Sequence, residues 1–160
     1  MKGIILLLGT NVGDRHANLK LACEKIENSN IVIISRSSIY ETEPWGFKSQ
    51  QAFYNQAINI RSRFNPFQLL EKLQLIEKEM GRVKNHLYGP RVIDIDILLF
   101  DNQVVKTEKL IIPHPHMHKR KFTLVPANEI GSDIIHPISG STISKLLDRC
   151  IENERVIRID

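Results

Sequence analysis

Apolar residues recur along this chain at two spacings, one typical of buried strands and one typical of amphipathic helices. The unbroken apolar stretch at 4–8 predicts a buried strand. After a turn at 9–14, apolar residues recur every three or four positions, which predicts a helix. Its buried side should carry Leu19, Ala22, Cys23 and Ile26. The glycines of the turn either permit the bend or cradle a phosphate, although the turn has neither Walker A nor GxGxxG spacing.

Two strands and a helix are expected next. The segment 31–42 starts with four apolar residues and predicts one long strand, and alternation at 53–61 predicts another. One face of the latter strand should carry Asn55, Ala57 and Asn59. Asn55 could hydrogen-bond either a planar heterocycle or nearby backbone groups. Between the strands, the rings of Trp45 and Phe47 either cover a core edge or close over a flat ligand.

The helix should begin at Asn65, since this residue can act as N-cap, Pro66 fits the first helical position and Gln68 can complete a capping box. It is expected to run to Met80, with Gly81 as its C-cap. The buried stripe should consist of Leu69, Leu73, Ile76 and Met80.

The most informative pattern lies at 88–100, where a Gly-Pro-Arg loop runs into a β-branched strand. Alternation places Asp94 and Asp96 on one face, and Ile93, Ile95, Ile97 and Leu99 on the other. Carboxylates about 7 Å apart on such a strand would repel each other and lose hydration unless a cation lies between them. Oxygen ligands suit Mg²⁺, which shares its coordination with water and substrate phosphates. The alternative is an exposed edge strand whose aspartates prevent aggregation.

Basic residues near this strand favour an anionic ligand. The loop 82–91 carries Arg82, Lys84 and Arg91, and could fold over phosphates or be a solvated surface loop. Further along, His114, His116 and His118 have a spacing that zinc could use. The prolines between them and the basic run 119–121 argue against zinc, and favour His114 with Arg120 as phosphate ligands.

The order of elements predicts an α+β fold with a ferredoxin-like βαββαβ core, a mostly antiparallel sheet and a C-terminal extension, that is, an α-β-α sandwich. The two long helices should cover one face, and Asp94 and Asp96 should point to the helix-free face. The rest is expected to comprise a hairpin from 104–105 and 110–112, a core-packed segment at 122–127, a short helix at 141–150 and a strand or tail at 156–159. We expect a single domain, residues 1–160.

Composition and charge indicate the cellular compartment of the protein but do not identify its ligand. A net charge of +4 and a pI near 9.1 fit an anionic partner without identifying it. Cys23 and Cys150 lack CxxC spacing and are expected to be buried thiols in a reducing compartment. There is no apolar run of membrane-spanning length and no cleavage-type segment, so we expect a cytoplasmic protein without a membrane partner. Nothing in the sequence suggests an obligate assembly, so a monomer is expected, and the two aspartates of the 88–100 strand argue against a nucleic-acid partner.

An acidic metal site ringed by Arg82, Arg91, His114 and Arg120 fits phosphoryl-type transfer. No serine or cysteine nucleophile with an adjacent base is apparent, so direct attack by a substrate hydroxyl is expected. Two other classes are weighed: an RNA-binding sheet, which should show aromatics on its middle strands, and a zinc hydrolase built on the three histidines.

The chain resembles the 6-hydroxymethyl-7,8-dihydropterin pyrophosphokinase family along essentially all of its length. The resemblance rests on Gly9-Thr10-Asn11, Tyr40 to Gly46, Tyr54-Asn55, Gly81-Arg82, Gly89-Pro90-Arg91-x-x-Asp94-x-Asp96, and Pro113-His114-Pro115 with Arg120 and Phe122. It implies transfer of pyrophosphate from ATP to the hydroxymethyl group of the pterin in folate biosynthesis, by in-line attack on the β-phosphorus with release of AMP.

The resemblance also implies residue roles. Two Mg²⁺ ions would be held by Asp94 and Asp96, with ATP as co-substrate. The implied catalytic residues are Arg82, Arg91, Asp94 and Asp96. The implied ATP-binding residues are Gln74, Glu77, Arg82, Arg91, Ile97, Lys109, Ile111, His114 and Arg120. The implied pterin-binding residues are Thr42, Glu43, Pro44, Trp45, Phe53, Asn55, Asp94 and Phe122.

Three positions depart from the family's usual pattern. Leu87 stands where a basic residue often occurs, Lys84 replaces a frequent arginine, and Tyr88 takes a common tryptophan position. Because lysine cannot reproduce a bidentate arginine clamp, these differences bear on loop closure and turnover.

Overall fold

The computed structural model describes residues 3–43, 50–81 and 91–160. Its strands are β1 (Ile4–Thr10), β2 (Val32–Arg36), β3 (Tyr40–Thr42), β4 (Phe53–Arg61), β5 (Asp94–Phe100), β6 (Val105–Lys106), β7 (Ile111–Ile112) and β8 (Val156–Arg158). Its helices are α1 (Arg15–Glu27), α2 (Pro66–Glu79), α3 (Lys121–Gly131), α4 (Ile143–Arg149) and the 3-10 helix η1 (Met117–Lys119).

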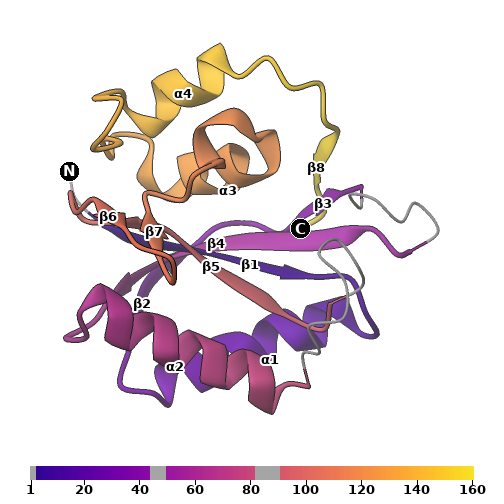
Figure 1. The fold of residues 1–160 in the computed structure, drawn as a ribbon. Coiled ribbons are helices and arrows are strands. Elements are labelled where there is room, and N and C mark those ends of the chain that lie inside the picture. Colours follow the sequence, from indigo (N-terminus) through magenta and orange to yellow (C-terminus); the bar gives the residue numbers. More distant parts are fainter. Residues whose placement is uncertain (1–2, 44–49, 82–90) are drawn as a thin grey trace.

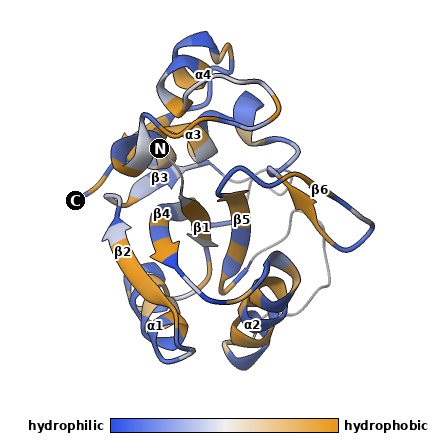
Figure 2. Ribbon diagram, turned by 90° about the vertical axis from the view of Figure 1, so that its left-hand side faces the viewer, coloured by the Kyte–Doolittle hydropathy of each residue, from blue (hydrophilic) through white to orange (hydrophobic). Residues whose placement is uncertain are grey.

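A six-stranded sheet forms the middle layer of the described structure. The strand order is β5-β1-β4-β3-β8, and β2 pairs with the half of β4 that β3 leaves open; every pairing is antiparallel. Helices α1 and α2 lie against one face, and α3 and α4 lie over the other (Figure 1, Figure 2). The predicted α+β fold with a mostly antiparallel sheet is therefore confirmed.

The α1 and α2 layer follows the predicted pattern closely. All four residues expected on the buried side of α1 are buried, and Asp14 caps the helix by accepting a hydrogen bond from the Ala17 N–H at 3.0 Å. The capping box of Asn65 and Gln68 is present at the start of α2. Two details were wrong. Met80 is half-buried rather than part of the buried stripe. It is also the C-cap, and Gly81 follows it with a φ of +89°, a conformation that glycine adopts without steric cost.

The long strand expected at 31–42 was also wrong, because the chain forms two shorter strands there. At the break, Ser37 donates its N–H to Ala57 O at 2.8 Å, and its hydroxyl accepts the Ala57 N–H at 2.9 Å. A side-chain oxygen thus replaces a backbone carbonyl in the pairing with β4, which separates β2 from β3.

A bulge in β5 corrects the predicted face of Leu99. Opposite β1, Ile97 pairs with Leu6 and Leu99 with Ile5, so that Leu98 is an extra residue. Residues 93, 95 and 97 face the α1 and α2 side as expected, but Leu98 and Leu99 pack in the core beneath α3. The bulge therefore ends the simple alternation on which the prediction relied.

The C-terminal part forms the second helical layer. The segment 122–127 belongs to α3, the hairpin is β6 with β7, and the predicted short helix and terminal strand are α4 and β8. The face expected to be helix-free is in fact partly covered by α3 and α4 (Figure 1). Cys23 is buried as expected, whereas Cys150 is only half-buried, and both are free thiols. Across the described ranges, no helix has the length and apolar character needed to cross a membrane.

We predict that Leu73→Ala lowers the free energy of unfolding by about 2 to 5 kcal/mol, because Leu73 is fully buried and its loss leaves a cavity. Urea unfolding measures the change. Leu75→Ala is the matched control, since Leu75 is 52% exposed on the same helix, and it should change stability by less than about 0.5 kcal/mol. Equal losses in the two variants would contradict the assigned helix orientation.

Candidate functional site

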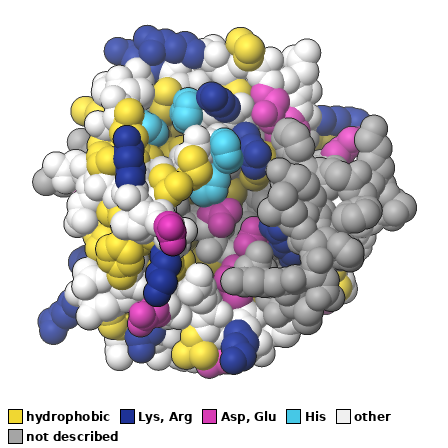
Figure 3. Space-filling view, viewed as in Figure 1, with side chains coloured by type: hydrophobic (Ala, Val, Ile, Leu, Met, Phe, Trp, Pro, Cys, Tyr) yellow, Lys and Arg dark blue, Asp and Glu magenta, His cyan; other side chains and the backbone are white. Residues whose placement is uncertain are grey.

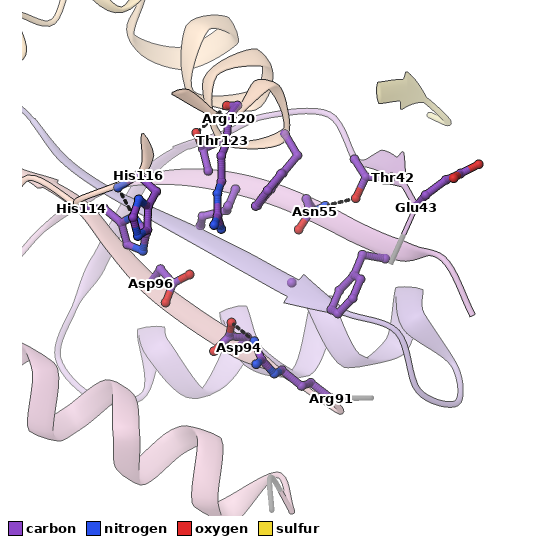
Figure 4. Close-up of a pocket in the computed structure, with 14 residues that line it drawn as sticks. Thr42, Glu43, Asn55, Arg91, Asp94, Asp96, His114, His116, Arg120 and Thr123 are labelled. Carbon is purple, nitrogen blue, oxygen red and sulfur yellow. Dashed lines mark hydrogen bonds and ion pairs between the residues drawn. The ribbon is translucent and has the colours of Figure 1, made fainter. Parts of the chain in front are cut away.

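A cavity of about 490 Å³ opens on the α3 face of the sheet, where β1, β4 and β5 extend beyond the start of α3 (Figure 4). On the side of the molecule that Figure 3 shows, histidine and basic side chains lie next to acidic ones. The structure brings many of the predicted site residues to its wall, namely Thr42, Glu43, Phe53, Asn55, Arg91, Asp94, Asp96, His114, Arg120 and Phe122.

The acidic side of the cavity comes from β5. Asp94 lies opposite Gly9 and Asp96 opposite Leu7 in the register with β1, and all four residues line the cavity. The two carboxylates therefore leave the same face of the strand, as alternation predicted. Arg91 Nη1 lies 3.0 Å from Asp94 Oδ2 and partly offsets this negative charge.

The donor set at Asp94 and Asp96 fits a hard cation. The two side chains present only oxygen atoms, and both face the same cavity (Figure 4). Over the described ranges, no group of three or more His, Cys, Asp or Glu residues forms a cation cage. Such a pair suits Mg²⁺, whose remaining positions water and substrate oxygens can complete.

The basic side of the cavity is built after β7. The His114 N–H donates to Leu98 O at 2.9 Å, which ties this segment to the bulge of β5. His114 Nδ1 accepts the His116 backbone N–H at 3.2 Å, so a neutral His114 ring carries its proton on Nε2. Burial, His116 and Arg120 lower the pKa of His114 to about 4, although Asp94 opposes the shift. The ring is thus a neutral hydrogen-bond donor at neutral pH.

The opposite end of the cavity offers a buried amide and two aromatic rings. Asn55 is buried and donates its Nδ2–H to Thr42 Oγ1 at 2.8 Å, which fixes the orientation of the amide. A Cβ on Gly9 would lie only 3.0 Å from Asn55 Oδ1. Glycine at this position therefore avoids crowding the amide. Phe53 and Phe122 also line the cavity. This end can bind a flat polar ring by hydrogen bonds and stacking.

Asn11 joins the two chain segments that border the cavity. Its N–H donates to Arg91 O at 3.0 Å, and its Oδ1 accepts the Arg91 N–H at 2.7 Å. Its Nδ2 donates to Gln50 Oε1 at 2.9 Å and to Gln51 O at 3.1 Å. One buried side chain therefore fixes the beginning of the 91–100 segment relative to the beginning of the 50–61 segment.

A second cavity of about 260 Å³ shares Asp96 and His114 with the first. Three further predicted residues line it, namely Ile97, Lys109 and Ile111. Glu77 and Gln74 line neither cavity: Gln74 is exposed on α2, and buried Glu77 accepts the Ile95 N–H at 2.8 Å. The adjoining cavities can hold two ligands that meet near Asp96.

The three histidines of the zinc alternative do not converge. The rings of His114 and His116 lie 6.1 Å apart between centroids, whereas His118 instead packs against His136, with centroids 5.8 Å apart. The geometry therefore does not support a zinc site built on these three residues.

Four residues of the first cavity were not among the predicted binding residues, namely Leu7, Gly9, His116 and Thr123, although Gly9 had been considered as part of a phosphate cradle and His116 as a zinc ligand. Alternation in β1 places Leu7 and Gly9 on the same face, but the predicted strand ended at residue 8 and left Gly9 in the turn. Thr123 required knowledge of how η1 leads into α3, where its hydroxyl donates to Met117 O at 2.6 Å. The predicted residues Pro44, Trp45 and Arg82 lie outside the described residues, as do Lys84, Leu87 and Tyr88.

Comparisons with known proteins give a consistent result. The family model for 7,8-dihydro-6-hydroxymethylpterin-pyrophosphokinase (HPPK) matches residues 5–132. A Bacillus subtilis protein named 2-amino-4-hydroxy-6-hydroxymethyldihydropteridine pyrophosphokinase is 45% identical over 130 residues, which are 81% of this chain and 78% of that protein. The folic acid synthesis protein fol1 of Pneumocystis carinii is 39% identical over 153 residues, which are 96% of this chain but 21% of that protein.

Among solved structures, Plasmodium falciparum HPPK-DHPS with pteroate matches with a TM-score of 0.73 at 17% identity. The match covers 92% of this chain and 42% of that one. At this identity the likeness shows the fold alone. The chain thus spans less than half of the Pneumocystis and Plasmodium proteins.

We predict that the His114 imidazole stays neutral until the pH falls to about 4. Its pKa lies below the 6.5 of an ordinary histidine, so the unfolded chain binds this proton first, and falling pH destabilises the fold between 6.5 and about 4. Nitrogen-15 NMR of the ring measures the midpoint and the tautomer, with His114→Gln to identify the signals. A midpoint near 6.5 would contradict the burial of this ring.

Proposed function

This chain belongs to the 7,8-dihydro-6-hydroxymethylpterin-pyrophosphokinase family, and on that premise we propose that it transfers the pyrophosphoryl group of ATP to the hydroxymethyl group of 6-hydroxymethyl-7,8-dihydropterin. The activity is that of the 2-amino-4-hydroxy-6-hydroxymethyldihydropteridine diphosphokinase of folate biosynthesis. The observation that carries the proposal is the pair of adjoining cavities that share Asp96 and His114. Each cavity residue lies within the matched residues 5–132.

The pterin occupies the end of the first cavity around Asn55. The Asn55 amide reads the polar edge of the ring, Thr42 holds that amide in place, and Phe53 and Phe122 provide the apolar faces. Glu43 also lines this cavity, and the resemblance assigns Pro44 and Trp45 to pterin binding as well. The hydroxymethyl group then points toward Asp94, which also binds the pterin.

ATP occupies the second cavity and reaches the first with its phosphates. Ile97, Lys109 and Ile111 line this cavity and surround the nucleoside. The resemblance also assigns Gln74 and Glu77 to ATP, although neither residue lines the cavity. His114 donates from Nε2, and Arg120 supplies a fixed positive charge to the phosphates. Arg82 and Arg91 neutralise phosphate charge as the substrates come together.

Asp94 and Asp96 would hold two Mg²⁺ ions, which supply positive charge to the phosphate oxygens and to the attacking hydroxyl. The hydroxymethyl oxygen attacks the β-phosphorus in line. A bond forms between that oxygen and the β-phosphorus, the bond from the β-phosphorus to the oxygen shared with the α-phosphate breaks, and AMP leaves with the electron pair. The hydroxyl proton is released. Arg91 exchanges its contact with Asp94 for phosphate oxygens during the reaction.

Residues 1–160 act as one pyrophosphokinase domain in this proposal. The protein works as a monomer in the cytoplasm, with ATP and the pterin as its only substrates. An RNA-binding role fits the cavity poorly, because Asp94 and Asp96 would repel a phosphate backbone in the absence of a cation.

Nucleotide product analysis tests this function. The protein is incubated with ATP and Mg²⁺, with and without 6-hydroxymethyl-7,8-dihydropterin, and the nucleotides are separated by chromatography. We expect AMP that depends on the pterin, in equal amounts with pterin pyrophosphate. Pterin-dependent ADP would instead indicate transfer of a single phosphoryl group, and the absence of any turnover would overturn the proposal.

We predict that Asp94→Asn and Asp96→Asn each lower kcat by about 10³-fold or more, because each removes a charged oxygen ligand needed in the transition state. The fold should remain intact, as thermal unfolding can verify. Asp133→Asn, at an exposed site away from the cavity, is the matched control and should behave as wild type. Near-normal turnover in either β5 variant would remove that aspartate from the proposed chemistry.

A further inference from the structure

Arg15 is the first residue of α1, a position that the helix itself does not favour for a cation. The N-terminal end of a helix carries a partial positive charge, which repels a guanidinium group. No acidic residue lies in the first turn, and Asp14 already caps the helix. Helix formation alone therefore does not explain an arginine at this position.

The Arg15 side chain extends from α1 to the neighbouring ends of β3 and β4. Its Nη1 donates to Ala52 O at 2.9 Å, directly before β4 begins. The guanidinium carbon lies 3.8 Å from the centroid of the Tyr54 ring, close enough for cation–π attraction. Nη1 also lies 3.7 Å from Glu41 Oε2 on β3. Because the side chain is only 19% exposed, water weakens these contacts less than it would at the surface.

These contacts lie behind the end of the first cavity that the proposed function gives to the pterin. In the register of β3 with β4, Glu41 pairs with Tyr54, and the next pair is Thr42 with Phe53. Neighbouring residues of a strand face opposite sides, so the first pair faces α1, whereas the second pair lines the cavity. Figure 1 shows α1 on the sheet face opposite α3. Arg15 thus joins the two strands directly behind Thr42 and Phe53.

The pairing of β4 ends at this point. Within the described ranges, Thr42 with Phe53 is the last pair between β3 and β4, and the register of β4 with β1 already ends at Tyr54. The backbone before Phe53 therefore lies beyond the paired part of the strand on both sides. Strand ends open more readily than strand centres. The hydrogen bond from Arg15 to Ala52 O holds the backbone at this end.

We propose that Arg15 is a positioning residue for the pterin: its contacts behind the sheet hold Phe53 and Thr42 where the ring binds. Thr42 in turn fixes the amide of Asn55. Arg15 lines neither cavity, and none of the three residues that it contacts lines the second cavity. Its effect is therefore on pterin binding and not on nucleotide binding. The identity of the two ligands rests on the proposed function.

Calorimetry with two ligands tests this inference. It gives the Kd of α,β-methylene-ATP with Mg²⁺, and then the Kd of 6-hydroxymethyl-7,8-dihydropterin for protein saturated with that analogue, whose carbon bridge blocks the transfer. Arg15→Ala removes all three contacts. Arg15→Lys keeps a positive charge near Glu41 but lacks the planar group that reaches Ala52 O and the Tyr54 ring together. Lys20→Ala is the matched control, because it removes one positive charge from an exposed position of the same helix.

We expect Arg15→Ala to raise the Kd of the pterin by about tenfold, the effect of losing one or two contacts that order a binding group. The Kd of the nucleotide analogue should change by less than about twofold, since its cavity is separate. Arg15→Lys should also weaken pterin binding, and Lys20→Ala should bind both ligands as wild type.

Steady-state rates separate positioning from a general loss of folded protein. Arg15→Ala should raise the KM for the pterin and leave the KM for ATP unchanged. Loss of folded protein alone would lower kcat and leave both KM values unchanged. Thermal unfolding verifies that each variant is folded, and Arg15→Lys decides the question if Arg15→Ala does not fold.

Three results would overturn the proposal. These are wild-type pterin affinity in Arg15→Ala, an equal loss of affinity for both ligands, or wild-type pterin affinity in Arg15→Lys, which would show that charge alone suffices. Wild-type protein that binds both ligands but forms no pterin-dependent AMP would overturn the proposed function alone. Wild-type protein that does not bind the pterin would overturn both.

Discussion

The site depends on two like charges placed on the same face of one strand. Asp94 and Asp96 lie two residues apart on β5, in a sheet whose other positions are mostly apolar. Carboxylates in such a place lose hydration and repel each other unless cations or water reach them. The open cavity, the ion pair from Arg91 at 3.0 Å and the basic residues after β7 meet that requirement. The binding properties of the cavity follow from the same charges.

The bulge at Leu98 divides the α3 face of the sheet into two parts. Before the bulge, the two aspartates face the cavity. At the bulge and directly after it, Leu98 and Leu99 pack in the hydrophobic core beneath α3. The Leu98 carbonyl accepts the His114 N–H at 2.9 Å, so the bulge also positions the basic side of the site beside the acidic side. Local irregularity in one strand thus brings together groups that are distant in sequence.

Patterns local to one element were predictable, and contacts between elements were not. The capping box at Asn65 and the common face of Asp94 and Asp96 follow from short-range spacing, and the structure has both. The break at Ser37 and the bulge at Leu98 depend on pairing with β4 and β1, which no spacing reveals. The role of Asn11 in joining Arg91 to residues 50 and 51 likewise needs the folded chain. The resemblance indicated the cavity residues more fully than spacing did, although it did not include Gly9 or Thr123 in the site.

Electron paramagnetic resonance of Mn²⁺, used in place of Mg²⁺, tests most directly whether the two aspartates hold the cation. Wild-type protein, the Asp94→Asn/Asp96→Asn double variant and the Asp133→Asn control are titrated with Mn²⁺ in the presence of α,β-methylene-ATP. For wild type and the control, the account predicts more bound Mn²⁺ than the nucleotide alone can hold. For the double variant, it predicts that this additional Mn²⁺ is lost. Equal Mn²⁺ binding by all three proteins would contradict it.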